Sequence, residues 1–149
     1  MDLKAVNDIP FIELDLDIDY SKLLFEYRKI EEKYAFKSYQ SDYFGVKRKY
    51  KKSWSGICLI GSDGELYSDM SENEPEDLKS TELEKICPYM FSLIRMLGAD
   101  DERCRIMRIA PKSSLVWHSH MLEHHQPYWQ LTCQIPIIVP KEFNYYVLH

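Results

Sequence analysis

The last third of the chain limits its fold most, because from residue 103 onward it carries strand patterns and no helical ones. Apolar and polar side chains alternate there with the period of two that half-buried strands show, and Pro111 ends the first run. The predicted strands cover residues 103–110, 114–120, 128–139 and 143–148. Strands in series after helices indicate an α+β protein with helices packed on a β-sandwich or barrel.

Apolar residues at helical spacing come before these strands. They predict a helix over residues 21–36, with Asp19 or Ser21 as its N-cap and a charged outer face. Ahead of this helix, residues 12–19 alternate apolar and acidic side chains. That alternation indicates a strand or an extended arm with one apolar face.

A second apolar stripe predicts a helix over residues 81–97. It begins at Thr81-Glu82-Leu83-Glu84, which matches a capping box, in which a hydroxyl and a carboxylate satisfy backbone N–H groups reciprocally. Pro88 lies inside the stripe and is expected to kink or restart the helix. Residues 53–64 predict a strand closed by a glycine turn, and the polar residues 68–79 predict a surface loop.

Length and composition indicate one folded domain. The chain has 149 residues, of which 45% are hydrophobic and 29% charged, as in ordinary globular proteins. We divide this domain into an N-terminal strand and helix region, 1–52, and a β core, 53–149, with one inserted helix. The formal net charge of −5 argues against a broad nucleic-acid-binding surface.

The cysteines and the absence of long apolar runs bear on the compartment. No apolar run approaches the length that spans a bilayer, and no apolar signal segment follows the acidic N-terminus. We therefore expect a cytoplasmic protein with no membrane partner and with reduced, buried thiols. The four cysteines form no CxxC motif and are Cys58, Cys87, Cys104 and Cys133.

The predicted strand 114–120 carries the best indication of chemistry. His118 and His120 project to the same side of a strand, about 7 Å apart, and can converge on one metal ion. His124 and His125 are adjacent in sequence, so they would add at most one ligand. The alternative that stays open is that these histidines are exposed to solvent, since an HxH pair in a single sequence is a weak signal.

The predicted strand 128–139 has one polar and one apolar side. Gln130, Thr132 and Gln134 share the polar side, and Cys133, Ile135 and Ile137 belong to the apolar one. If helices cover the apolar side, the polar side lines a pocket into which His118 and His120 also point. The alternative is that the polar side faces water.

These segments together resemble a known family. The segment Ser114-Leu115-Val116-Trp117-His118-Ser119-His120, followed by residues 130–142 with their ending Val139-Pro140-Lys141-Glu142, resembles the core of aspartyl/asparaginyl β-hydroxylases. Trp54-Ser55 and the helix start at Thr81 extend the resemblance over residues 50–149. The family comprises Fe(II)- and 2-oxoglutarate-dependent oxygenases on a double-stranded β-helix, so the resemblance implies a cupin-like jelly roll with N-terminal helices packed on the sheet.

The resemblance also implies roles for individual residues. His118 stands at the first metal-ligand position, and His120 stands where other members carry Asp or Gly. Thr132 and Gln134 stand where the hydroxylases place an Arg and a His that contact 2-oxoglutarate. Both side chains are neutral here, and a neutral amide does not offset the desolvation of a carboxylate as a cation does.

The family's second histidine ligand, and the Arg that pairs with the distal carboxylate, come later in the pattern than His149. We therefore expect that the last strands are missing and that the oxygenase is either truncated and inactive or completed by a longer chain. Open sheet edges would then favour a homodimer.

A second resemblance leaves other functions open. Pro111-Lys112, followed by His118-Ser119-His120 and Glu123, approximates the cupin motif, which would make His118, His120 and Glu123 the metal ligands. A third alternative is a non-catalytic binding domain of the same fold. In each case the expected partner is a small molecule or a peptide.

Overall fold

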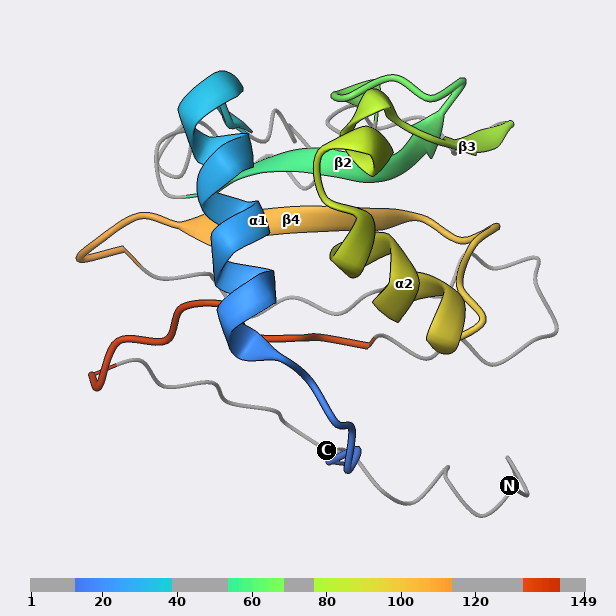
Figure 1. Cartoon of the computed structure of the whole chain (residues 1–149). Coiled ribbons are helices and arrows are strands. Elements are labelled where there is room, and N and C mark those ends of the chain that lie inside the picture. The colour runs from blue at the N-terminus through green and yellow to red at the C-terminus, as the bar shows by residue number, and fades with distance from the viewer. Residues whose placement is uncertain (1–12, 39–53, 69–76, 114–132, 143–149) are drawn as a thin grey trace, which may run out of the picture.

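The computed structural model describes residues 13–38, 54–68, 77–113 and 133–142. These ranges form two α-helices, a 3-10 helix and one antiparallel sheet (Figure 1). In chain order the elements are α1 (Tyr20–Lys33), β1 (Lys37–Ser38), β2 (Trp54–Ser62), β3 (Leu78–Ser80), η3 (Glu82–Lys85), α2 (Pro88–Met96) and β4 (Cys104–Ile109).

β2 is the central strand of the sheet. β4 pairs with it along one edge, while β1 and β3 pair with the start and the end of its other edge. The β2–β4 register places Ile57 opposite Ile106 and Cys58 opposite Arg105. A bulge between Cys58 and Ile60 interrupts the register, as one extra residue in a strand does.

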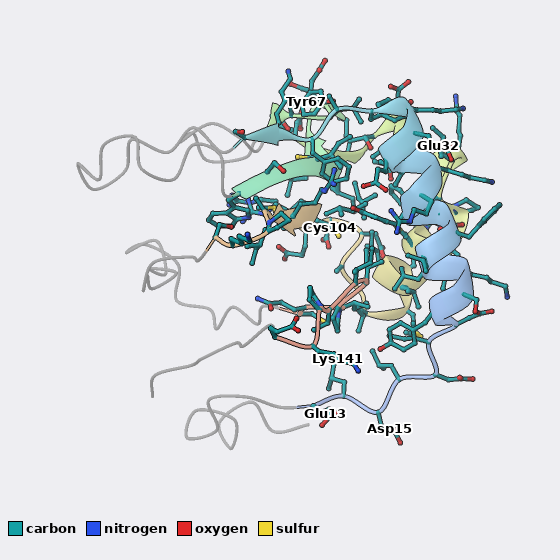
Figure 2. All side chains as sticks on the ribbon, turned by 90° about the vertical axis from the view of Figure 1, so that its left-hand side faces the viewer. Glu13, Asp15, Glu32, Tyr67, Cys104 and Lys141 are labelled. Atoms are coloured by element: carbon teal, nitrogen blue, oxygen red, sulfur yellow. The ribbon has the colours of Figure 1, made fainter. Side chains whose placement is uncertain are left out.

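Both helices pack on the same face of this sheet (Figures 1 and 2). Ile57 of β2 and Ile106 of β4 share a buried cluster with Ile30 of α1 and Phe91 of α2, and none of the four is more than 5% exposed. Burial of side chains of this size contributes about 1.5–3 kcal/mol each. The hydrophobic core of the described residues therefore lies between the helices and the sheet.

α1 forms as the sequence predicts at its start and ends earlier than predicted. The Asp19 carboxylate accepts hydrogen bonds from the N–H groups of Ser21 and Lys22, so Asp19 is the N-cap. The helix ends at Lys33 rather than Phe36, because Tyr34 adopts an extended backbone that leads into β1. Residues 13–19 form no strand and lie outside the sheet, and the N–H of Leu16 donates to the carbonyl of Leu14, which marks a tight turn in this segment.

Pro88 restarts the second helix, as its position predicts. η3 ends before it, and α2 begins with Pro88 in its first turn. Proline has no backbone N–H and breaks a helix interior, but its fixed φ suits the first helical position.

The predicted capping box is wrong in one of its two hydrogen bonds. The Thr81 hydroxyl accepts from the Leu83 N–H, which satisfies one donor of η3. The N–H of Thr81, however, donates to the carbonyl of Leu59 in β2. The carboxylate of Glu84 is thus not needed there and instead pairs with Arg95 of α2.

β3 was not expected, since residues 68–79 predict a loop. All three residues of β3 pair with residues 60–62 of β2. The strand therefore depends on pairing within the sheet rather than on its local sequence.

Residues 133–142 lie beside β4 on the side away from β2 (Figure 1). Ile135 and Ile137 pack against the core, and Gln134 is exposed. None of these residues belongs to a strand, so the strand predicted over 128–139 is wrong in its described part. Pro136 lacks the N–H that a ladder needs. The other C-terminal strands, and with them the double-stranded β-helix, fall on residues outside the described ranges and stay predictions.

Candidate functional site

The predicted metal site lies outside the described residues. His118, His120 and Thr132 all fall within residues 114–132, as does Glu123 of the cupin alternative. Gln134 is the one predicted site residue that the structure describes, and its side chain is exposed. Among the described residues no group of three or more His, Cys, Asp or Glu side chains is placed to hold a metal ion. The metal and cosubstrate site stays a prediction.

The face of the β2–β4 pair that turns away from the helices carries side chains of both strands. We call it the helix-distal face. Ile57 and Ile106 face each other on the helix side, so the alternating neighbours point the other way. The residues of the helix-distal face are Trp54, Gly56, Cys58, Arg105, Met107 and Ile109.

The helix-distal face combines apolar side chains with one cation. Arg105, Met107 and Trp54 are half-buried, and Ile109 is 37% exposed. Nothing in the sequence analysis singled out Arg105. The run Cys104-Arg105-Ile106-Met107 alternates as a half-buried strand does, but the alternation does not tell which side the helices cover. Only the pairing with β2 shows that side.

The helix side of the sheet carries a cluster of charges that are paired with one another. Arg108 of β4 donates to Glu31 of α1 at 2.9 Å, and its guanidinium lies 4.6 Å from the centre of the Phe36 ring. Arg28 also donates to Glu31. The hydrogen bond from Arg28, with the added attraction of Arg108, lowers the pKa of the Glu31 carboxyl. Burial raises the pKa of the neighbouring Tyr27 hydroxyl.

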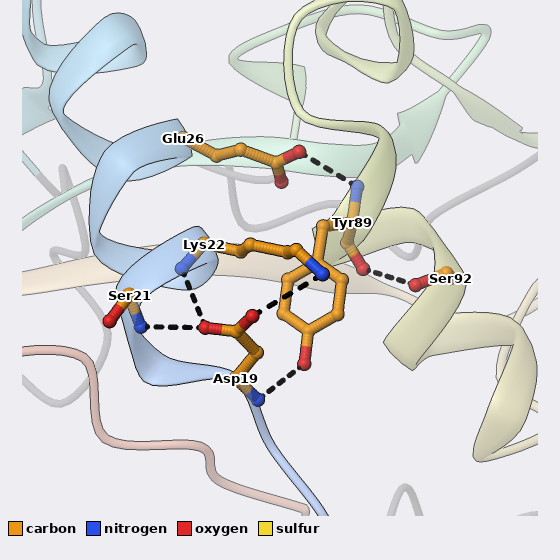
Figure 3. Close-up of polar contacts among 6 residues, drawn as sticks. All are labelled: Asp19, Ser21, Lys22, Glu26, Tyr89 and Ser92. Atoms are coloured by element: carbon orange, nitrogen blue, oxygen red, sulfur yellow. Dashed lines mark hydrogen bonds and ion pairs between the residues drawn. The ribbon is translucent and has the colours of Figure 1, made fainter.

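A second polar cluster joins the two helices (Figure 3). The Glu26 carboxylate accepts hydrogen bonds from the backbone N–H groups of Tyr89 and Met90 at 2.8 and 2.9 Å. The N–H of Asp19 donates to the Tyr89 hydroxyl at 2.6 Å. Cys87 provides no side-chain cap for α2, so Glu26 fills that role from α1. The groups of this cluster are hydrogen-bonded to one another, so the cluster ties α1 to α2 and has a structural role.

The four cysteines form no disulfide bond with one another in the structure. Burial raises the pKa of Cys87 to about 12 and that of Cys104 to about 11, so both are protonated and poorly nucleophilic at neutral pH. Cys58 is buried as well, but the prediction of burial is wrong for Cys133, which is exposed.

A shallow hollow of about 310 Å³ lies near the turn after β2. Among the described residues, its lining contains two carboxylates and no cationic side chain, which suits an acidic ligand such as 2-oxoglutarate poorly. The lining residues are Gly64, Glu65, Leu66, Tyr67 and Glu82.

A scan against protein-family models found no match, and searches of curated proteins and of solved structures found none either. No helix in the described part of the chain combines the length and apolar character needed to cross a membrane.

Proposed function

We propose that the protein is a 2-oxoglutarate- and Fe(II)-dependent oxygenase similar to aspartyl/asparaginyl hydroxylases. The observation that carries the proposal is the sequence pattern from Val116 to Glu142, in which His118 occupies the family's first metal-ligand position. Its substrate would be a small molecule or a peptide.

The described structure supports the layout that this proposal needs. In a jelly roll, the outer apolar face of a sheet is covered by helices and the inner face lines the ligand pocket. Here α1 and α2 cover the apolar face of the β2–β4 pair, and the helix-distal face carries Arg105. Ile135 and Ile137 pack toward the core, while Gln134 is an exposed residue.

In this proposal His118 and His120 bind Fe(II) through imidazole nitrogens, and Thr132 and Gln134 donate hydrogen bonds to the cosubstrate. Bound iron would supply the oxidising chemistry, in which hydroxylation of a substrate C–H bond by O2 would be coupled to the conversion of 2-oxoglutarate to succinate and CO2. Thr132 and Gln134 are neutral, so they can donate hydrogen bonds to the keto oxygen but supply no positive charge to a carboxylate.

The test combines metal content with turnover. The full chain is loaded with Fe(II), and bound iron and succinate release are measured with 2-oxoglutarate and O2. We expect His118→Ala to lose iron and succinate release, whereas the matched variant His125→Ala keeps both. Equal iron in the two variants would count against the site.

The cupin alternative makes a different prediction for the same assay. There Glu123→Ala loses iron, and turnover does not depend on 2-oxoglutarate. A chain that binds no iron at all would favour the third alternative, a non-catalytic binding domain.

The compartment and the oligomeric state are part of the proposal. The four free cysteines support a reducing compartment such as the cytoplasm. The homodimer expected from open sheet edges stays part of the proposal; in the described residues β4 pairs with β2 along one edge, and residues 133–142 lie beside its other edge (Figure 1).

A further inference from the structure

The cysteines of the chain gather around the start of β4, although they are far apart in the sequence. Cys104, labelled in Figure 2, is the first residue of β4 and packs against the core, in which Cys87 is buried. Cys133 begins the described segment 133–142, which lies beside β4 in both views of the molecule (Figures 1 and 2). Cys58 belongs to β2, the strand that pairs with β4.

Charge interactions between the thiols agree with this placement. Burial is the main cause that raises the pKa of Cys104 to about 11, and the charges of Cys133 and Cys58 also raise it. Burial likewise raises the pKa of Cys87 to about 12, with smaller contributions from the Glu26 carboxylate and from Cys104. Since the interaction between two charges weakens with their distance, Cys104 has the other three thiols as neighbours.

Exposure separates these four thiols. Cys58 and Cys87 are both 0% exposed, Cys104 is half-buried and Cys133 is exposed. An oxidant dissolved in water therefore meets Cys133 first, and Cys104 is the neighbour of Cys133 that is not fully enclosed by the core. Residues 133–142 belong to no strand, so no sheet ladder holds Cys133 at a fixed separation from Cys104.

We propose that Cys133 and Cys104 form an oxidation site, at which a hydroperoxide converts the two thiols into a disulfide bond. The Cys133 thiolate attacks a peroxide oxygen and the O–O bond breaks. The leaving oxygen takes up a proton and departs as water or an alcohol, and Cys133 becomes a sulfenic acid. The Cys104 sulfur then attacks the Cys133 sulfur, and the sulfenic hydroxyl leaves with the Cys104 proton as water. The two thiols lose two electrons in total, and the peroxide gains them.

The disulfide ties the segment 133–142 to β4 and closes the chain from Cys104 to Cys133 into a loop. In sequence, this loop contains the histidines of residues 118–125, so oxidation restrains the part of the chain that carries the predicted metal ligands. The inference does not rest on the proposed function, because it uses only the thiols and the described residues around them.

The experiment treats the reduced full chain with hydrogen peroxide, blocks the remaining thiols with N-ethylmaleimide in denaturant, and maps unreduced peptides by mass spectrometry. We expect a peptide pair joined through Cys104 and Cys133, which dithiothreitol separates. Its yield should not depend on protein concentration, because the bond forms within one chain. Cys104→Ser should abolish the pair and leave Cys133 as a sulfenic acid that dimedone traps. The matched variant Cys58→Ser, which removes a buried neighbour of Cys104, should keep the pair.

Circular dichroism checks that each variant is folded. Cys133→Ser changes an exposed side chain, so it tests the site without opening the core and should also abolish the pair. A bond from Cys133 to Cys58, to Cys87 or to a second chain would overturn the proposal. Oxidation of Cys133 without any cross-link, or a wild-type chain whose thiols all stay reduced, would overturn it as well.

Discussion

The carboxylate of Glu26 in α1 accepts a hydrogen bond from the backbone N–H of Met90 in α2, 64 positions away in the chain, at 2.9 Å. Glu26 is only 6% exposed. A buried carboxylate that satisfies backbone donors of another helix ties the two helices together, because separating them would leave both the charge and the donors without partners.

Glu26→Ala should lower the free energy of unfolding by about 2–3 kcal/mol, the cost expected for charge-assisted hydrogen bonds whose partners stay buried. Urea unfolding followed by circular dichroism measures it. Glu32→Ala is the matched control on the exposed side of α1 and should change stability by no more than about 0.5 kcal/mol. Similar losses in the two variants would contradict the capping role.

The pair between Glu31 and its arginines should make stability depend on pH. Because Arg28 and Arg108 hold the pKa of Glu31 below its ordinary value of 4.5, its contribution is complete above that value. It is lost as the pH falls through the folded-state pKa, since the unfolded state then binds the proton more readily. The difference in unfolding free energy between wild type and Glu31→Gln, at most about 1 kcal/mol for so exposed a pair, should shrink from pH 7 to pH 4. A constant difference would argue against the ion pair.

Thiol reactivity should separate Cys133 from the buried cysteines. Cys133 is exposed, whereas burial raises the pKa of Cys87 and Cys104 to about 12 and about 11. Iodoacetamide at pH 8 should therefore modify Cys133 first, as read by mass spectrometry of the native chain. Cys133→Ser should remove the fast phase. Labelling of Cys87 at the rate of Cys133 would show that α2 does not stay packed on the core.

A sheet edge left open beside β4 would pair with a second chain, so the proposed homodimer should be seen in sedimentation experiments at micromolar concentration. Ile109→Lys places a charge at the end of this strand, where Ile109 is 37% exposed. Charged side chains on edge strands oppose pairing between chains, so the variant should shift the protein toward monomer. A wild-type chain that sediments as a monomer would rule out the dimer.

Local features could be predicted from the sequence because local chemistry determines them. Asp19 caps α1 through its own neighbours, and Pro88 starts α2 because the missing N–H costs nothing there. β4 ends at Ile109, shortly before Pro111, because proline cannot donate a hydrogen bond to a sheet ladder. Each of these signals lies within a few residues of the structure that it produces.

Features that depend on distant partners escaped prediction. The carboxylate of Glu84 does not bind the N–H of Thr81 as expected, because that N–H already donates to the carbonyl of Leu59. β3 forms because its residues pair with the edge of β2. The side of the sheet on which Arg105 lies could not be decided before its partner Cys58 was known. The histidines of residues 118–125 have a clear local pattern, but their convergence on one metal ion is a prediction about residues outside the described ranges.

The bulge between Cys58 and Ile60 shifts the phase of β2, so that Ile57 and Ile60 both lie in the core although they are three positions apart. A regular strand would turn one of them outward. The sequence of β2 thus shows an unbroken apolar run, 57–60, where a two-residue rhythm would be expected. Adding or removing one residue between Trp54 and the bulge would exchange the inward and outward sides of that segment, so length changes should be tolerated only in the loops that flank this strand.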